Sequence, residues 1–550
     1  MAPGMLINAD FNPCFTSCSL VTIKMTIGTY RNRVGSISIS ESGAKTQTKD
    51  DSTSDGSSIS GTFSAHHDGQ MVDGKFIRNG GLGWFITGLF IIGDLAGGGL
   101  VAVPTAMIQL NFYPGLVILF IMNVVTLLTG VTLGLCWNIL LRFWPKYRSH
   151  CRKPYPEIAN MALGPKWKMI VSIIIDLTQF GIAVVYLLLS AKNIHDAIKS
   201  FSSFEISFCW VILILAVCLL PIMFLKSPQD FWAAVVVAMV TTATAVVLIL
   251  VGSIMDYGVC HEQHHMPDFK ITNYFLGLGT LLFAYGGHSS LPTVQHDMKQ
   301  PHEFTKSVVM GFLALFVLYI PVSIMGYLTY GDSLRDSVIN SIQNQGIQQT
   351  INLLITVHCI LTLTIVFNPL NQDIEQLFKV PHRFGIKRVI VRTSVMVAVA
   401  FVAESVPTFG PLLDLLGGTT LTLTSILLPV LFYMYLHALE NKVKKLKDPE
   451  HPTEDDLKTL SFSEMREHLP GWMFIIAALI LILGLIGGGA ATFSAIRELS
   501  TTKFTYPCYV QPFISGAGGN DEHSTNCCGY SFNVSHSGVK CAVWEDSFYK

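Results

Sequence analysis

A glycine-rich string with one acidic side chain is the part of this sequence best suited to ligand chemistry. Asp94 is followed by three consecutive glycines, Gly97, Gly98 and Gly99, and all four lie inside an apolar run. Three adjacent glycines cost roughly 1 kcal/mol each in helix propensity relative to alanine, so a helix through them is weakened. A half-helix that starts there presents unpaired backbone N–H groups and the positive end of its dipole. This arrangement suits a ligand carboxylate, although close packing between helices is the alternative use of such small residues.

Asp94 is a rare acidic residue within a segment apolar enough to lie in a bilayer. Intramembrane carboxylates usually face a cavity and mark substrate, ion or proton pathways. We expect Asp94 to bind a ligand ammonium, to hold a coupling cation or to carry a proton. The alternative is that its side chain caps backbone N–H groups freed beside the glycines. Asp176 is a second acidic residue of this kind.

A second string repeats the pattern, with Tyr285, Gly286, Gly287 and His288 inside another apolar run. An unperturbed histidine titrates near about 6.5, so His288 could change its charge between an acidic compartment and the cytosol. The alternative is a neutral histidine that forms hydrogen bonds with the loosened backbone. Tyr285 could form an aromatic wall of a binding site, or it could simply pack.

The two strings lie in the first and sixth of eleven apolar segments. Half of the residues are hydrophobic, 13% are charged, the formal net charge is −1 and the mean hydropathy is +0.48. Soluble domains are roughly a quarter charged, whereas about 20 apolar residues cross a bilayer core. The sequence predicts an all-α polytopic membrane protein in a lipid bilayer, with no nucleic acid partner. The predicted spans are 82–108, 113–141, 168–191, 207–225, 231–255, 271–296, 307–328, 350–376, 389–405, 412–437 and 471–496.

The two glycine-rich interruptions indicate which class of membrane protein this is. Backbone at membrane depth leaves helical geometry only where it is buried in protein or lines a wet cavity. Matched interruptions in two halves of a chain indicate the binding site of a secondary transporter. We therefore expect helices one and six to be discontinuous around a ligand site, and the chain to work by alternating access. A continuous channel fits this pattern less well.

Lys and Arg are concentrated in three loops, at 142–168, 379–392 and 442–447, each of which follows an even-numbered span. Because basic residues mark cytoplasmic loops, the amino terminus is predicted to be cytoplasmic and the carboxyl terminus extracellular or lumenal. The plasma membrane and an organelle membrane are both open. The expected parts are a disordered cytoplasmic tail at 1–80, a transporter domain at 81–497 and a cysteine-containing tail at 498–550.

The predicted outer tail carries two features typical of a non-cytoplasmic compartment. Asn533 begins an N-x-S glycosylation pattern. Four cysteines could form two disulfides in an oxidising compartment, and Cys260, also predicted to lie outside, could compete with them. These four are Cys508, Cys527, Cys528 and Cys541. Four other cysteines lie in predicted spans and are expected to be packing residues: Cys136, Cys209, Cys218 and Cys359.

Residues 261–265 match H-E-x-x-H, the helical pattern of zinc proteases. That chemistry requires His261 and His265 on one helix face, a third ligand and an open metal position. Here the string lies in a short loop before Pro267, so we interpret it as a chance match and expect neither a metal site nor enzymatic activity. A metalloprotease is the formal alternative.

Several stretches occur in order along the predicted spans. They are GGGLVAVP at 97–104, FGIAVVYLLL at 180–189, FAYGGH at 283–288, PTVQ at 292–295, DMKQP at 297–301, FNP at 367–369, ESVP at 404–407 and LGGT at 416–419. With these stretches the chain, over about residues 80–496, resembles the amino acid/auxin permease family, a branch of the amino acid–polyamine–organocation transporters.

The resemblance implies a LeuT-like inverted five-plus-five repeat, with spans 1–5 and 6–10 as the two halves and span eleven added. It implies that the carboxylate and ammonium of an amino acid meet the two breaks, at 97–99 and 285–288, with Tyr186 of span three as a wall. Sodium-coupled members carry an asparagine where Gly93 aligns, which favours protons as the coupling ion. Thr362 and Thr364 of span eight could still help to coordinate sodium.

We therefore predict a proton-coupled amino acid transporter with no cofactor and no obligate protein partner. Asp94 and His288 are the candidate proton-coupling residues. Two alternatives are open: a sodium-coupled amino acid transporter, and an amino acid sensor that keeps the fold and signals through its 80-residue tail. Binding of an amino acid without its accumulation would favour the sensor.

Overall fold

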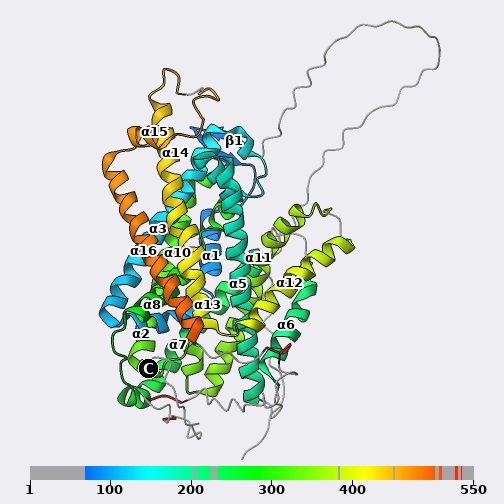
Figure 1. Cartoon of the computed structure of the whole chain (residues 1–550), viewed down its shortest axis with the longest axis vertical. Helices are drawn as coiled ribbons and strands as arrows, with labels where there is room; N and C mark the ends of the chain where they lie inside the picture. Colours follow the sequence, from blue (N-terminus) through cyan, green and yellow to red (C-terminus); the bar gives the residue numbers. More distant parts are fainter. Residues whose placement is uncertain are drawn as a thin grey trace, which may run out of the picture. The chain divides into compact units, whose positions relative to one another are not determined.

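The apolar segments of the chain fold into helices, as the computed structural model shows (Figure 1). The structure describes residues 69–201, 206–224, 232–381, 385–449, 452–501, 507–510, 527–529 and 534–535. The prediction of disorder before residue 69, the glycosylation site at Asn533 and the cysteine at position 541 therefore lie outside the described residues.

The bounds of the elements follow the hydropathy of the sequence closely. The first half contains β1 (Gly69–Val72), β2 (Lys75–Arg78), α1 (Trp84–Leu95), α2 (Gly98–Leu110), α3 (Phe112–Phe143), η1 (Pro145–Arg148), α4 (Pro154–Leu163), α5 (Pro165–Phe201), α6 (Phe208–Met223), α7 (Trp232–Cys260) and η3 (His261–Gln263). The second half contains α8 (Ile271–Ala284), α9 (Leu291–His296), η4 (Pro301–Glu303), α10 (Phe304–Tyr330), η5 (Gly331–Ser333), η6 (Val338–Ser341), α11 (Gln345–Leu377), α12 (Ile386–Ser405), α13 (Phe409–Leu416), η7 (Gly417–Leu421), η8 (Leu423–Leu427), α14 (Leu428–Lys444), α15 (Phe462–His468) and α16 (Gly471–Thr501).

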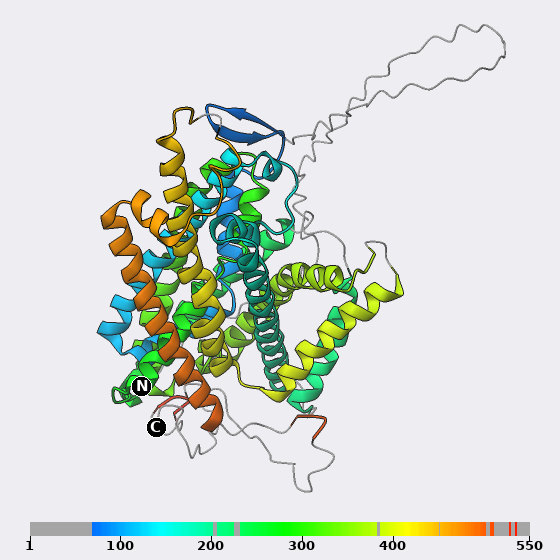
Figure 2. The same cartoon turned by 45° about the horizontal axis from the view of Figure 1, so that its top comes forward.

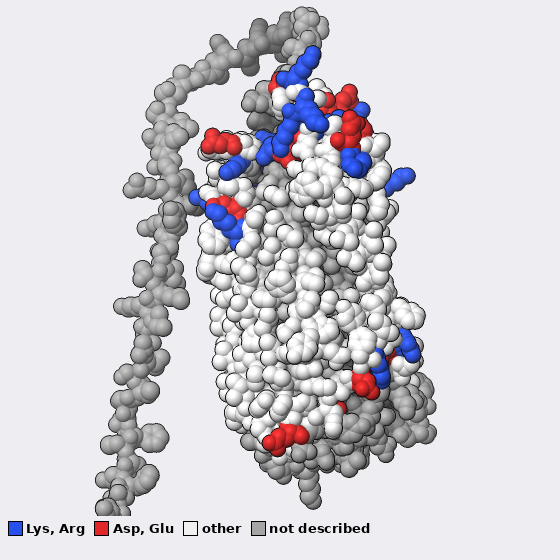
Figure 3. Space-filling model, turned by 90° about the vertical axis from the view of Figure 1, so that its left-hand side faces the viewer, with Lys and Arg blue, Asp and Glu red and all other residues white. Residues whose placement is uncertain are grey.

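Many of these helices are suited to a bilayer. Seven described helices are long and apolar enough to cross a membrane, and the bent pair α1–α2 makes an eighth. The apolar helices α6 and α8 are shorter, with 16 and 14 residues. On the face shown in Figure 3, a wide band without charged side chains separates charged groups at the two ends. The most apolar window of α16 is only 11% buried in protein, as expected of a helix that faces lipid. The chain is an all-α polytopic membrane protein.

Both predicted interruptions are present. The first apolar segment bends by 59° between α1 and α2, at Ala96 and Gly97. The sixth is divided into α8 and α9, with residues 285–290 between them. Each helix ends two residues before the first glycine of its string, α1 at Leu95 and α8 at Ala284, because glycine has the weakest helix propensity apart from proline.

Helix packing places the two interrupted segments beside each other. The α2 helix packs on α8, and α1 packs on α10, which itself contacts α2. On the other side, α5 packs on α11 and α11 on α7. The α6 and α12 helices pair with each other (Figure 2). The breaks therefore lie in the interior, with α5, α10 and α11 as neighbours.

The predicted tenth span is not a uniform α-helix. After α13 the chain forms two π-helical stretches, η7 and η8, before α14 continues the same segment. A side chain at Gly417 would collide with the backbone of Gly279, since its Cβ would lie 1.9 Å from the Gly279 oxygen. Thr422 donates its hydroxyl hydrogen to Gly417 O at 2.7 Å, five residues earlier. Such π-helical turns are frequent at functional sites.

The prediction of a disordered tail up to residue 80 is wrong for its last part. Strands β1 and β2 form an antiparallel hairpin, with Gly69 opposite Arg78. The hairpin is held by the loop after α9: Arg78 N donates to Lys299 O, and Leu82 exchanges backbone hydrogen bonds with this loop. A guanidinium nitrogen of Arg78 lies 2.9 Å from His296 Nδ1. These contacts, which involve residues far away in sequence, are not visible in local composition.

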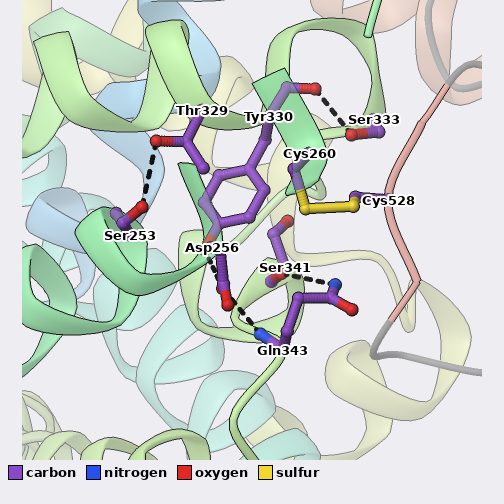
Figure 4. The surroundings of a disulfide bond; sticks show 9 residues. All are labelled: Ser253, Asp256, Cys260, Thr329, Tyr330, Ser333, Ser341, Gln343 and Cys528. Atoms are coloured by element: carbon purple, nitrogen blue, oxygen red, sulfur yellow. Dashed lines mark hydrogen bonds between the residues drawn. A yellow bond between two sulfur atoms is a disulfide. The ribbon is translucent and has the colours of Figure 1, made fainter. Parts of the chain in front are cut away.

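Two disulfides join the segment after α16 to other helices. Cys260 at the end of α7 is bonded to Cys528, next to the hydrogen-bonded groups of Asp256 and Tyr330 (Figure 4). Cys209 in α6 is bonded to Cys508. The interpretation of Cys209 as a packing residue is therefore wrong, because its sequence position did not reveal that α6 begins beside the tail. Cys527 is also disulfide-bonded, whereas Cys136, Cys218 and Cys359 are free.

We expect the Cys260→Ser/Cys528→Ser double variant to unfold at a lower temperature than the wild type. The disulfide closes a loop with a sequence separation of 268 residues, and the loss of such a constraint costs about 2 kcal/mol or more. The melting temperature of the purified protein checks this, with Cys218→Ser as the control. Labelling of Cys528 by a maleimide in the unreduced wild type would contradict the pairing.

Candidate functional site

The two helix breaks face each other at the centre of the bundle. A Cβ at Gly99 would lie 2.6 Å from Ala284 Cα, the last residue of α8. A Cβ at Gly287 would lie 2.3 Å from Leu95 Cδ2, at the end of α1. Such close approaches leave no room for side chains, which explains why glycine stands at both positions. The breaks therefore form one site to which both interrupted segments contribute.

Asp94 joins the two breaks through a hydrogen bond. The Ser290 hydroxyl donates to Asp94 Oδ2 at 2.7 Å, and a Cβ at Gly287 would lie 3.6 Å from the same oxygen. Asp94 is half-buried. Its carboxylate thus points toward the second break and contacts a side chain there, so it does more than cap its own helix. Ser290 was not among the predicted site residues, because a serine carries little signal by itself.

Gly97 and Gly98 face two other helices. A Cβ at Gly97 would lie 2.3 Å from His358 Nε2 of α11 and 3.2 Å from the Tyr186 hydroxyl of α5. A Cβ at Gly98 would lie 3.1 Å from Tyr186 Cε1. The α2 helix begins at Gly98, so the N–H groups of its first turn lack partners within the helix. The structure therefore places Tyr186 against the first break.

Tyr319 of α10 contacts both breaks through its hydroxyl, a role that the sequence did not predict. Its hydroxyl lies 3.1 Å from Leu95 O and 2.9 Å from Ala284 O, the carbonyls that precede each break. Its ring packs edge-on against Tyr285, with 5.2 Å between the ring centroids. A helix that stops leaves its last carbonyls without intrahelical partners, and Tyr319 serves one from each segment. A single tyrosine in an apolar run carries no signal of this role.

His288 and Gly286 point away from the meeting point of the breaks. The His288 ring is fully buried against α3, with Nε2 3.0 Å from Thr129 Oγ1 and 2.9 Å from Thr126 O. A Cβ at Gly286 would lie 3.0 Å from Leu421 Cδ2 of η7. In this structure His288 anchors the second break to α3, which is the neutral hydrogen-bonding role considered as the alternative. Tyr285 is fully buried, and its hydroxyl has no hydrogen-bond partner among the described residues.

The two threonines of α11 differ in their surroundings. Thr362 lies 3.3 Å from His358 Nε2, the atom that faces Gly97. The other ring nitrogen of His358 lies 2.8 Å from Thr242 Oγ1 of α7. Thr364 donates to Ile360 O of its own helix. Only Thr362 is thus linked to the first break, and the link runs through His358, a residue that the sequence analysis did not single out.

The H-E-x-x-H string does not form the helix that a zinc site requires. The α7 helix ends at Cys260, and His261 begins the short 3₁₀ helix η3, which ends before His265. His261 Nδ1 lies 2.6 Å from Leu328 O. Among the described residues, the one group of three potential metal ligands is Cys209, Glu404 and Cys508, and its two cysteines are joined in a disulfide.

Comparisons with known proteins show the family of the chain. The family model described as "Transmembrane amino acid transporter protein" matches residues 80–452. "Amino acid transporter AVT1J" from Arabidopsis thaliana is 24% identical over 359 residues, which cover 62% of this chain and 80% of the relative. "Auxin transporter-like protein 1" from the same plant is 24% identical over 366 residues, covering 64% of this chain and 70% of the relative.

Among solved structures, the crystal structure of MhsT in complex with L-phenylalanine covers 76% of this chain and 100% of its own, with a TM-score of 0.49 and 11% identity. The family match covers more than half of the sequence. The chain therefore belongs to the transmembrane amino acid transporter protein family, which confirms the resemblance to the amino acid/auxin permeases.

We expect Tyr319→Phe to destabilise the meeting point of the breaks. The variant keeps the ring contact with Tyr285 but removes the one hydroxyl hydrogen that Leu95 O and Ala284 O share, at a cost of about 1–3 kcal/mol. The melting temperature should fall, whereas Tyr113→Phe, at a tyrosine that is 80% exposed, should leave it unchanged. Equal melting temperatures for Tyr319→Phe and the wild type would show that the Tyr319 hydroxyl does not stabilise the contact between the breaks.

Proposed function

We propose that this protein is a secondary transporter of amino acids that works by alternating access. The observation that carries the proposal is the meeting of two helix breaks, with Asp94, Ser290 and the start of α2 converging on one place. A free amino acid has an ammonium and a carboxylate close together. Asp94 offers the negative group for the ammonium, and the first turn of α2 offers N–H donors for the carboxylate.

The family match supports this substrate class, and the names of the relatives extend it to amino acids and auxin, both of which carry a carboxylate. Tyr186 and His358 flank the first break on the side of α5 and α11. We propose that they bound the substrate on that side, with Tyr186 as the aromatic wall. The eleven spans and the inverted five-plus-five repeat belong to the same proposal.

We propose protons as the coupling ion. Gly93 stands where sodium-coupled members of the family carry an asparagine, and a Cβ there would lie 2.8 Å from Val235 Cγ1, so the position is filled by close packing with α7. Asp94 is the carboxylate at the breaks that could exchange a proton when the substrate binds. We further propose a cytoplasmic amino terminus, because the loops rich in Lys and Arg lie on that side of the predicted topology.

Gly98→Val tests the substrate site. Its Cβ would lie 3.1 Å from Tyr186 Cε1, and the branched side chain would occupy the space proposed for the carboxylate. We expect uptake of radiolabelled amino acids into proteoliposomes to be abolished while the protein remains folded. Gly489→Val is a matched control, because it replaces a helical glycine whose Cβ would meet nothing within 4 Å. Normal uptake by Gly98→Val would count against the site.

Asp94→Asn separates the roles considered for this carboxylate. The amide keeps an acceptor for the Ser290 hydroxyl but cannot ionise. If Asp94 carries the coupling proton, the variant should lose the dependence of uptake on a pH gradient. An unchanged pH profile would make Asp94 a structural residue. The readout is initial uptake across a series of external pH values, compared with Asp268→Asn, in which an exposed loop carboxylate is removed.

A further inference from the structure

A second polar site lies away from the meeting point of the breaks, between α2, α8 and α13. It is a cavity of about 10 Å³ whose polar lining comes from Thr105 and Gln109 of α2, Thr280 of α8, Asp414 of α13 and Asp336 of the loop between η5 and η6. Ser333, which precedes this loop, and Ser341, at the end of η6 after it, lie near the Cys260–Cys528 disulfide (Figure 4). The cavity is therefore at the end of the bundle to which the tail is bonded.

Hydrogen-bond acceptors exceed donors in this cavity. Asp414 is only 3% exposed, and the Thr280 hydroxyl donates to its Oδ1. Asp336 faces the same space, and the residues that line the cavity include no Lys, Arg or His. Burying a carboxylate without a counter-charge is costly. The lining as it stands lacks a positive partner for Asp414.

Gln109 provides an independent indication of a ligand. It is 6% exposed, it lines the cavity, and its Oε1 has no hydrogen-bond partner among the described residues. Thr105 on the same helix is engaged elsewhere, since its hydroxyl donates to Arg335 O at 2.8 Å and thereby holds the loop. Leaving a buried amide oxygen unpaired costs about 1–3 kcal/mol, and a cation between Gln109, Asp336 and Asp414 would remove this cost.

The size of the cavity and its ligands limit the occupant. A volume of this order admits about one water molecule, which excludes an amino acid and a hydrated magnesium ion. Carboxylate, amide and hydroxyl oxygens are ligands for hard cations. Two acidic groups from other elements, Asp336 and Glu498 of α16, act electrostatically on Asp414 and favour a positive occupant. Arg335, whose carbonyl accepts from Thr105, is the basic residue on the same loop as Asp336.

We propose that Asp414, Asp336 and Gln109 form a binding site for one small monovalent cation, either sodium or a proton on Asp414 accompanied by a water molecule. The site deepens the proposed transport function, because α2 and α8 are the halves of the interrupted segments at this end. A cation bound between them and α13 would hold this end closed. The π-helical stretch η7 begins directly after α13.

The cation site can be tested without transport. The melting temperature of the purified protein is measured in sodium chloride and in choline chloride at equal ionic strength, and then at lower pH without sodium. A ligand that binds the folded state raises its stability, so the wild type should be stabilised by sodium or by the acid step. Asp414→Asn should abolish the effect, and Asp268→Asn should preserve it. No stabilisation in either arm would overturn the proposal.

Gln109→Leu is a second variant that tests the cation site if Asp414→Asn does not fold. The substitution removes the unpaired acceptor at similar volume, and we expect it to weaken the apparent affinity for the stabilising cation by about tenfold or more. An unchanged cation titration in Gln109→Leu would contradict the site.

Counterflow exchange of amino acids, measured without ion gradients, reports on the proposed function separately. Exchange by the wild type that persists in Asp414→Asn, together with loss of gradient-driven accumulation, supports both proposals. Absence of exchange in the wild type would contradict transport, while the melting experiment would still decide the cation site. Gradient-driven accumulation by Asp414→Asn equal to that of the wild type would overturn the claim that a cation at this site holds this end of the bundle closed during transport.

Discussion

The need to satisfy backbone polar groups within a membrane is the constraint on which this structure depends. Two apolar helices stop in the interior of the bundle, and each leaves carbonyls that lipid could not bind. Here side chains near each break satisfy polar groups of the other. The Tyr319 hydroxyl lies within hydrogen-bond distance of both Leu95 O and Ala284 O, and the Ser290 hydroxyl donates to Asp94. Each interrupted segment therefore requires the other. The contact between the two breaks places the N-terminal end of α2 and the Asp94 carboxylate together in the interior.

The α3, α5 and α11 helices surround the place where the two breaks meet. The α5 and α11 helices bring Tyr186 and His358 against Gly97, and α3 receives the His288 ring on the opposite side of the second break. Small side chains at the crossings, such as Gly99 against Ala284, let the backbones approach closely. The four halves α1, α2, α8 and α9 are short, and longer-range packing supports three of them: α10 packs on α1 and α2, and α13 packs on α8.

Much of this architecture was predictable from local patterns. Apolar runs located the helices, and the strings at 97–99 and 285–288 located both interruptions, because glycine weakens a helix wherever it stands. Contacts between residues distant in sequence were not predictable. The role of Tyr319, the partner of Asp94, the pairing of Cys209 with Cys508 and the hairpin at 69–78 all depend on which segments become neighbours. His288 shows the same limit: its type indicated a titrating group, whereas its packing against α3 indicates an anchor.

The central claim is that the exposed main chain at the two breaks binds an amino acid. Cryo-electron microscopy of the purified protein with a transported amino acid tests it most directly. We predict ligand density between Asp94 and the first turn of α2, bordered by Tyr186 and by residues 285–290. Continuous helices through residues 96–97 and 285–290, or ligand density at a place that touches neither break, would contradict it.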